Sequence, residues 1–130
     1  MNSLKLRICC LLVLIYLAPI NIAQAETGQT FSHVLVVWLK QPGNEKMRQK
    51  FVAASERMNS LPGIISRHVG FVKKSDRKIV DDSFDIAVTV TLKDKAAYDA
   101  YMAHPLHKEI VERDLKPLVK KLIAYDFVSQ

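Results

Sequence analysis

Cysteine is nearly absent from this sequence, and the two cysteines that occur sit together near its start. Cys9 and Cys10 are the only cysteines among the 130 residues. The rest of the chain therefore has no disulfide, no thiolate metal ligand and no cysteine nucleophile. Since such a domain cannot be miscrosslinked in an oxidising compartment, its stability must come from its core or from oligomerisation.

Glycine is also sparse, which excludes several nucleotide-binding and catalytic motifs. The four glycines are Gly28, Gly43, Gly63 and Gly70, and none belongs to a phosphate-cradling loop. No Gly-x-Ser-x-Gly nucleophile elbow occurs in the sequence. The strand expected at 84–92 lacks the glycine and aromatic pattern of RNA-recognition modules, so we expect no nucleic-acid partner.

The length and the charge balance describe one small globular domain. With 130 residues, 49% apolar and 25% charged, the chain is too short for two domains and too apolar to be disordered. Lysine and arginine outnumber aspartate and glutamate by 19 to 13, which gives a net charge of +6. A basic run at 73–78 is nearly balanced by Asp76, Asp81 and Asp82 and is typical of a solvated loop.

The first 25 residues have the pattern of a secretory signal peptide. Lys5 and Arg7 form a basic start, residues 8–18 carry no charge, and residues 23–25 (Ala-Gln-Ala) form a small-x-small cleavage site. The 11 apolar residues fall short of the ~20 that span a bilayer, although a retained anchor is the alternative. We therefore expect cleavage after Ala25, no stable membrane insertion afterwards, and a secreted or periplasmic protein.

The remaining chain predicts the order strand, helix, strand, strand, helix, strand. Strands are expected at 31–40, 64–73, 84–92 and 122–129, where β-branched and aromatic residues lie between turn residues. The first helix is expected to follow an Asn44 cap and to end at residues 62–63, with apolar positions spaced by three and four. The second helix is expected after Asp94, with an interruption at His104-Pro105.

This order is that of the ferredoxin-like βαββαβ unit, an α+β fold with two helices on one face of a four-stranded antiparallel sheet. The strand at 31–40 is apolar on both faces, which indicates that both faces are covered. Because the helices of so short a chain cover one face, we expect an identical copy to cover the other. The sequence thus predicts a homodimer with a ligand site in its sheet-lined interior.

Several segments resemble the stress-responsive dimeric α/β-barrel (Dabb) family. They are the strand at 33–40, the Leu-Pro-Gly-Ile run at 61–64, the strand at 84–90, the run Tyr101-x-x-His104-Pro105-x-His107, and the Tyr-Asp-Phe run at 125–127. The resemblance covers residues 33–128, which we take as the domain, with residues 26–32 as a linker and strand entry. It implies the dimeric α/β barrel already expected from the uncovered sheet face, and we expect no cofactor.

One plant member of this family is a polyketide cyclase that performs an aldol condensation without a cofactor, using a histidine and a tyrosine of this motif. By resemblance, His107 and Tyr101 would be the catalytic residues, and His33 would line the same cavity. A further cavity histidine of that enzyme corresponds to Ile86 in this sequence. That departure disfavours the same reaction here.

Structural roles are the alternative for each of these residues. His107 could bond a strand carbonyl or Asp126, and Tyr101 could pack in the core with its hydroxyl at the rim. His33 and His104 are candidate ligand contacts, and His33 needs a polar partner if it faces an apolar cavity. The spacing of His104 and His107 suits one metal ion, but no clear third ligand follows from the sequence, so we expect no metal site.

Two functions are consistent with these observations. The first is an exported, homodimeric stress-responsive protein that binds a small apolar or aromatic ligand. The second is a cofactor-independent cyclase or lyase in which His107 moves protons and Tyr101 orients a carbonyl, and a cofactor-free monooxygenase is a further alternative. The lack of thiols, the lack of a clear metal-ligand set and the isoleucine at position 86 favour the first function.

Overall fold

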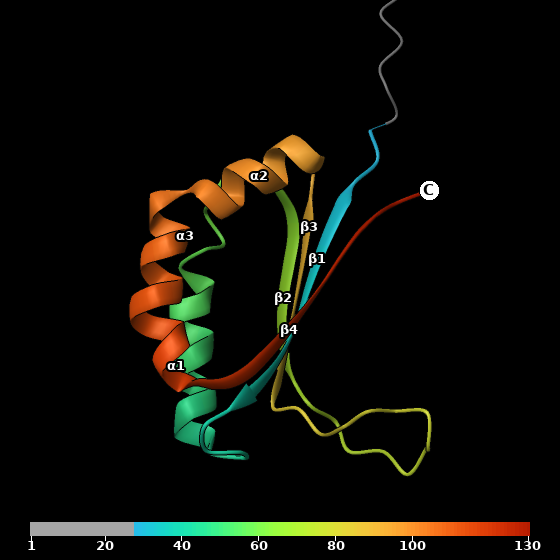
Figure 1. The fold of residues 1–130 in the computed structure, drawn as a ribbon, viewed down its shortest axis with the longest axis vertical. Helices are drawn as coiled ribbons and strands as arrows, with labels where there is room; N and C mark the ends of the chain where they lie inside the picture. The colour runs from blue at the N-terminus through green and yellow to red at the C-terminus, as the bar shows by residue number, and fades with distance from the viewer. Residues whose placement is uncertain (1–27) are drawn as a thin grey trace, which may run out of the picture.

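Residues 28–130, which the computed structural model describes, form a sheet with helices on one face (Figure 1). The elements in chain order are β1 (Phe31–Leu39), α1 (Glu45–Glu56), β2 (Ile64–Phe71), β3 (Ile86–Leu92), α2 (Lys95–Ala103), α3 (Pro105–Glu109) and β4 (Val119–Val128). A π-helical segment (Ile110–Leu115) and a 3-10 turn (Lys116–Leu118) connect α3 to β4. The expected signal peptide, residues 1–25, lies outside the described residues. Within residues 28–130, no helix combines the length and the apolar character needed to cross a bilayer.

The sheet confirms the predicted ferredoxin-like fold. Its strand order is β2-β3-β1-β4, and each neighbouring pair is antiparallel. All three labelled helices lie on the same side of the sheet, whereas no helix of the described chain covers the other side (Figure 1). The two strands at the centre, β1 and β3, therefore carry the residues on which the helices pack.

The core lies between the helices and the sheet. Alternate residues of β1 and β3 point to this side, as the alternation of buried and less buried positions along both strands shows. The buried apolar side chains are Phe31, Val37, Leu39, Phe51, Met58, Leu61, Ile86, Val88, Val90, Leu92, Tyr101 and Ile110. Since burial of one large apolar side chain stabilises a fold by ~1.5–3 kcal/mol, this layer provides the main driving force for folding.

The first two helices begin where the sequence places capping residues. Asn44 Oδ1 accepts a hydrogen bond from the Met47 backbone N at 3.0 Å, and Asp94 Oδ1 accepts one from the Ala97 N at 2.7 Å. Each cap satisfies a backbone N–H of the first turn that has no partner within the helix. The predicted starts of both helices are thus confirmed.

The helix α1 ends at Glu56 rather than at residues 62–63, β2 ends at Phe71 rather than at residue 73, and β1 and β4 each end one residue early. Two strands also start at other residues than predicted. β3 begins at Ile86 rather than at residue 84, because the Asp85 carboxylate turns to the β1–α1 connection. There it accepts hydrogen bonds from the Leu39 N at 2.9 Å and the Gly43 N at 2.7 Å. β4 begins at Val119, three residues before the expected start, because the chain pairs with Leu39 across a register shift. Long-range contacts set both boundaries, so the local pattern did not reveal them.

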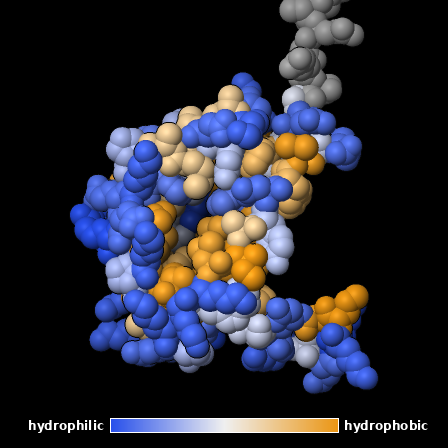
Figure 2. All heavy atoms as spheres, viewed as in Figure 1, coloured by the Kyte–Doolittle hydropathy of each residue, from blue (hydrophilic) through white to orange (hydrophobic). Residues whose placement is uncertain are grey.

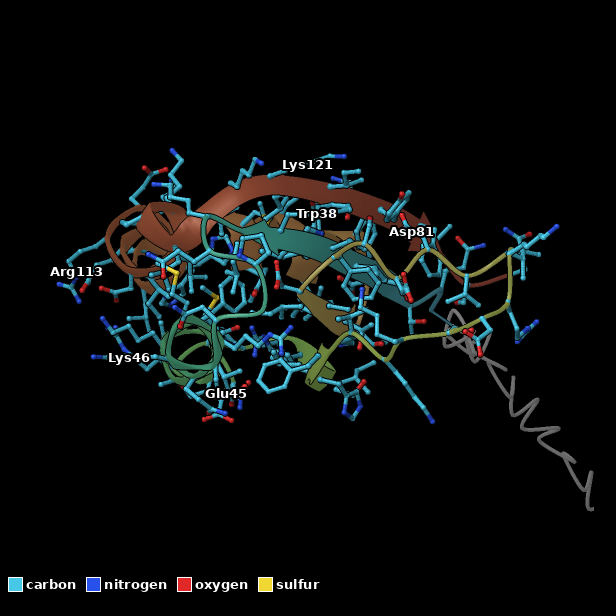
Figure 3. All side chains as sticks on the ribbon, turned by 90° about the horizontal axis from the view of Figure 1, so that it is seen from below. Trp38, Glu45, Lys46, Asp81, Arg113 and Lys121 are labelled. Carbon is cyan, nitrogen blue, oxygen red and sulfur yellow. The ribbon has the colours of Figure 1, made fainter. Side chains whose placement is uncertain are left out.

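The uncovered face of the sheet is apolar along its centre. It carries Val34, Val36 and Trp38 of β1 opposite Tyr125, Ile123 and Lys121 of β4, with Phe127 at the end. The side chains of Tyr125 and Phe127 are 54% and 55% exposed. Lys121 Nζ lies 4.3 Å from the centroid of the Trp38 ring, so a cation caps one end of this apolar strip (Figure 3). This is the face that the sequence predicted to be covered by a second copy.

Candidate functional site

A cavity of about 300 Å³ lies inside the single chain, between the sheet and the helices. Most of its lining side chains are apolar, among them Leu35, Phe51, Met58, Val88, Val111 and Leu115. Figure 2 shows apolar atoms on both sides of a recess between the helix layer and the sheet. The sequence predicted a ligand site in the barrel interior enclosed by two copies, whereas this cavity lies on the opposite face of the sheet and is lined by a single chain.

The polar part of the cavity wall includes both residues expected to be catalytic. Tyr101 of α2 and His107 of α3 both line the cavity, with their ring centroids 4.6 Å apart. The Tyr101 side chain is 3% exposed, and its hydroxyl donates to Met58 Sδ at 3.4 Å. Burial raises the pKa of the Tyr101 hydroxyl above its usual 10.0, although the nearby Arg67 guanidinium acts in the opposite direction. This tyrosine therefore stays protonated and can donate a hydrogen bond.

His107 is held as a neutral imidazole. Burial lowers its pKa from 6.5 to about 4, with smaller contributions from His33, Arg67, His104 and Lys108. A neutral imidazole has a free ring nitrogen that can accept a hydrogen bond or a proton, and the lowered pKa makes it a weaker base than a solvated histidine.

The bend between α2 and α3 positions His107. Pro105 occupies the first turn of α3, and His104 Nδ1 accepts a hydrogen bond from the Leu106 N at 3.1 Å. His104 is thus the cap of α3 and does not line the cavity, so its geometry supports a structural role. One turn further along, His107 is 8% exposed and points into the core.

His33 also lies outside the cavity wall and has a different partner. Its Nδ1 is 2.5 Å from Asp126 Oδ1, and the Tyr98 hydroxyl donates to Asp126 Oδ2 at 2.9 Å. Burial and then the hydrogen bond to Asp126 raise the pKa of Tyr98 to about 12. Because Asp126 binds His33 and Tyr98, it does not serve as the partner that the sequence suggested for His107.

Arg67 is a cavity residue that the sequence reasoning missed. It lies on β2 opposite the buried Val90, so its side chain shares the helix-covered face of the sheet. Its Nη1 donates to Asn59 Oδ1 at 3.0 Å, and its Nη2 donates to Ser55 Oγ. The signal was present in the sequence, because strand alternation places Arg67 on the same face as Val69. A cation on an apolar strand face is unusual enough to mark a candidate site.

Four polar side chains on the wall, those of Ser55, Arg67, Tyr101 and His107, form one connected group. Ser55 accepts from Arg67, the Arg67 charge acts on the Tyr101 hydroxyl, and the Tyr101 ring lies against His107. Within residues 28–130, no three histidine, cysteine, aspartate or glutamate side chains cluster in a way that could hold a metal ion. The group can therefore offer a cation, a hydrogen-bond donor and a neutral base to one bound molecule.

A family model described as "Stress responsive A/B Barrel Domain" matches residues 31–129, from the first residue of β1 to one residue past the end of β4. A solved Dabb family protein with a ferredoxin-like fold, from Mesorhizobium loti MAFF303099, is 24% identical. That comparison covers 78% of this chain and 98% of the other, with a TM-score of 0.66. A comparison with curated proteins found no match.

Two further solved structures share the fold. Hydroxynitrile lyase from Passiflora edulis is 16% identical over 78% of this chain and 94% of that one, with a TM-score of 0.68. A protein from Thermobifida fusca YX, described as dimeric, ferredoxin-like and of unknown function, is 17% identical over 79% and 93%, with a TM-score of 0.63. At these identities the likeness establishes the fold alone.

Proposed function

The chain belongs to the stress-responsive A/B barrel domain family, and from that premise we propose that it binds a small, mainly apolar molecule in the cavity between its helices and its sheet. The observation that carries this proposal is the composition of the wall. Apolar side chains surround a few convergent polar groups, which is the usual composition of a small-molecule site. The apolar wall would provide affinity, and the polar group would orient the ligand.

A homodimer is part of the same proposal. The apolar strip on the uncovered sheet face needs a partner, and a second copy presents the same strip to it. The Thermobifida fusca relative, which shares the fold, is described as dimeric. In this arrangement the dimer contact and the ligand cavity lie on opposite faces of the sheet.

Export is the third part of the proposal. The pattern of the first 25 residues supports cleavage after Ala25, which would give a secreted or periplasmic protein that starts at Glu26. Intact mass measurement of the protein recovered outside the cytoplasmic membrane tests this. A mass that still includes residues 1–25 would contradict cleavage.

Acid–base catalysis is the second candidate function, and the contact between His107 and Tyr101 on the cavity wall favours it. A neutral, buried imidazole beside a protonated tyrosine can remove a proton while the Tyr101 hydroxyl donates to a developing oxyanion. One protein of the same fold is a hydroxynitrile lyase. Turnover of β-polyketones or cyanohydrins by the wild type, with loss in both His107→Asn and Tyr101→Phe, would support this function. No turnover with any of these substrates would contradict it.

The binding proposal is tested by methyl NMR with octanamide, a neutral amphiphile. We expect shifts of the Val88 and Val111 methyl signals, which report on the cavity, and none at Val34 on the uncovered sheet face. Shifts confined to Val34 would instead place the ligand in the sheet-lined interior, and no shifts at all would reject small-molecule binding of this kind.

A variant that fills the cavity makes the test independent of signal assignment. Val111→Phe adds bulk to the wall and should weaken octanamide binding at least about tenfold, because the apolar part of the ligand loses its space. Val80→Phe is the matched control, since Val80 lies on an exposed loop away from the cavity. Equal binding by the two variants would contradict the proposed site.

A further inference from the structure

The Arg67 guanidinium is the one charge on the cavity wall that has no opposite charge beside it in the described part of the chain. Its hydrogen-bond partners are the neutral oxygens of Asn59 and Ser55. Its Nε is buried and has no hydrogen-bond partner among residues 28–130. No carboxylate of these residues forms an ion pair with it.

Two other cationic side chains near the core, those of Arg48 and Lys116, each have a carboxylate beside them. Arg48, whose Nε is likewise buried, has the buried Asp85 carboxylate 3.5 Å from its Nη2. Lys116, which also lines the cavity, pairs with Glu112 at 2.7 Å. A cation held against apolar surroundings without a counter-charge is unfavourable, so Arg67 stands apart from both.

The composition of the wall agrees with an anionic ligand. Arginine, lysine, histidine, tyrosine and serine all contribute to it, but neither aspartate nor glutamate does. A ligand carboxylate beside Arg67 would meet no like charge on this wall. The neutral His107 imidazole could donate an N–H to it, and the Tyr101 hydroxyl could do so by exchanging Met58 Sδ, a weak acceptor, for the carboxylate.

We propose that the ligand of this cavity is an amphiphilic carboxylic acid, whose carboxylate binds the Arg67 guanidinium while its apolar chain or ring lies against the wall formed by Val88, Val111 and Leu115. The inference rests on the proposed binding function and names the chemical class of its ligand. The planar guanidinium suits a carboxylate, because it can donate two parallel hydrogen bonds to the two oxygens. The cavity volume of about 300 Å³ suits an acid of modest size.

The test compares octanoate with octanamide, two probes of nearly the same shape that differ in charge. Isothermal titration with the wild type should show octanoate binding about tenfold or more tightly than octanamide, because a charge-assisted hydrogen bond replaces a neutral one. In Arg67→Gln this preference should disappear while octanamide affinity changes less than about threefold. Arg67→Lys should keep part of the preference, since it retains the charge but not the planar pair of donors.

Arg77→Gln is the matched control, because it removes the same charge from the exposed loop outside the cavity. It should leave the preference for octanoate unchanged, which separates a local contact from the general effect of net charge. Circular dichroism melts of all variants establish that they fold.

The outcomes distinguish the two proposals. Equal wild-type affinities for octanoate and octanamide, or a preference that survives in Arg67→Gln, would overturn the carboxylate assignment and leave cavity binding in place. Binding of neither probe would overturn the binding function and this inference together.

Discussion

His33 on β1 and Asp126 on β4 face each other across the sheet, with His33 Nδ1 2.5 Å from Asp126 Oδ1. Tyr98 of α2 donates its hydroxyl to the second carboxylate oxygen, and its ring stacks on Phe31 with the centroids 4.1 Å apart. Asp126 thereby connects the edge strand, the central strand and the helix layer. The bridge restrains α2, which carries Tyr101 on the cavity wall.

Replacement of Asp126 by asparagine tests this bridge. Burial opposes the charged form, but the hydrogen bonds from His33 and Tyr98 outweigh it and keep the pKa of this carboxyl below its usual 3.8. We expect Asp126→Asn to lower the free energy of unfolding at pH 7 by about 1 kcal/mol, a modest amount because the carboxylate is partly exposed and screened. Urea unfolding at several pH values measures this.

The contribution of Asp126 to the free energy of unfolding should depend on pH, because folding lowers the pKa of its carboxyl. A carboxyl whose pKa is lowered by folding contributes stability above its unfolded pKa, and this contribution is lost as the pH falls through the folded pKa. The difference between wild type and Asp126→Asn should therefore shrink below pH 3.8. Asp76→Asn, on an exposed loop, is the control and should show no such difference.

The lowered pKa of His107 should make the free energy of unfolding depend on pH in the acid range. Because burial lowers its pKa from 6.5 to about 4, the unfolded chain binds a proton in this pH range that the folded chain does not. Stability should therefore fall as the pH drops from 6.5 to 4, by about 2–3 kcal/mol from this group, and not change on its account above pH 6.5.

The His107→Asn variant should lose this part of the acid dependence, whereas His68→Asn, at an exposed position of β2, should keep it. Denaturant titrations between pH 4 and pH 7 measure both variants. The same acid profile in wild type and His107→Asn would contradict a neutral, buried imidazole.

Gly63 is required by both its backbone conformation and its close packing. Its φ is +85°, and a Cβ at this position would lie 2.8 Å from Ala97 Cβ. Gly63→Ala should cost about 2–3 kcal/mol of stability, from conformational strain plus the clash with α2. Thermal or urea unfolding measures the change.

Gly43→Ala separates the two causes. Gly43 has a φ of +71°, but nothing lies within 4 Å of the Cβ it would carry, so only the conformational cost of about 1 kcal/mol should appear. Ala97→Gly should recover part of the loss in Gly63→Ala by removing the clash. Equal costs at the two glycines would show that α2 does not restrict position 63.

The proposed dimer contact is tested on the uncovered sheet face. Val36 pairs with Ala87 of β3 and Ile123 of β4 at the centre of this face. Val36→Glu should give a monomer, because burial of an unpaired carboxylate in an apolar contact is unfavourable. Sedimentation velocity at micromolar concentration should show a dimer for the wild type and for the control Ala53→Glu, on the exposed side of α1. A monomeric wild type would contradict the dimer.

Those parts of the fold that depend on local patterns could be predicted from the sequence. Alternation along β1 and β3 and the caps at Asn44 and Asp94 are interactions between residues a few positions apart. These contacts give the order of the elements. The bend at His104-Pro105 likewise follows from the steric restriction that a proline places on the residue before it.

The site was harder to predict from the sequence than the fold, because it depends on contacts between distant segments. His33 and Asp126 are 93 residues apart in the sequence, and only the pairing register of β1 with β4 brings them together. The family resemblance identified Tyr101 and His107 as candidates, and both line the same cavity in the structure. Neither the location of that cavity under the helices nor the contacts of Arg67 follow from periodicity, because periodicity does not specify how closely helices approach a sheet.

The side chains that line the cavity come from one chain and lie on the sheet face away from the proposed dimer contact. Two copies joined through their sheets would thus act as independent units, each saturating with a hyperbolic curve and without cooperativity. In assemblies mixed from intact and Arg67-substituted subunits, the number of sites that prefer octanoate to octanamide would decline in direct proportion to the fraction replaced.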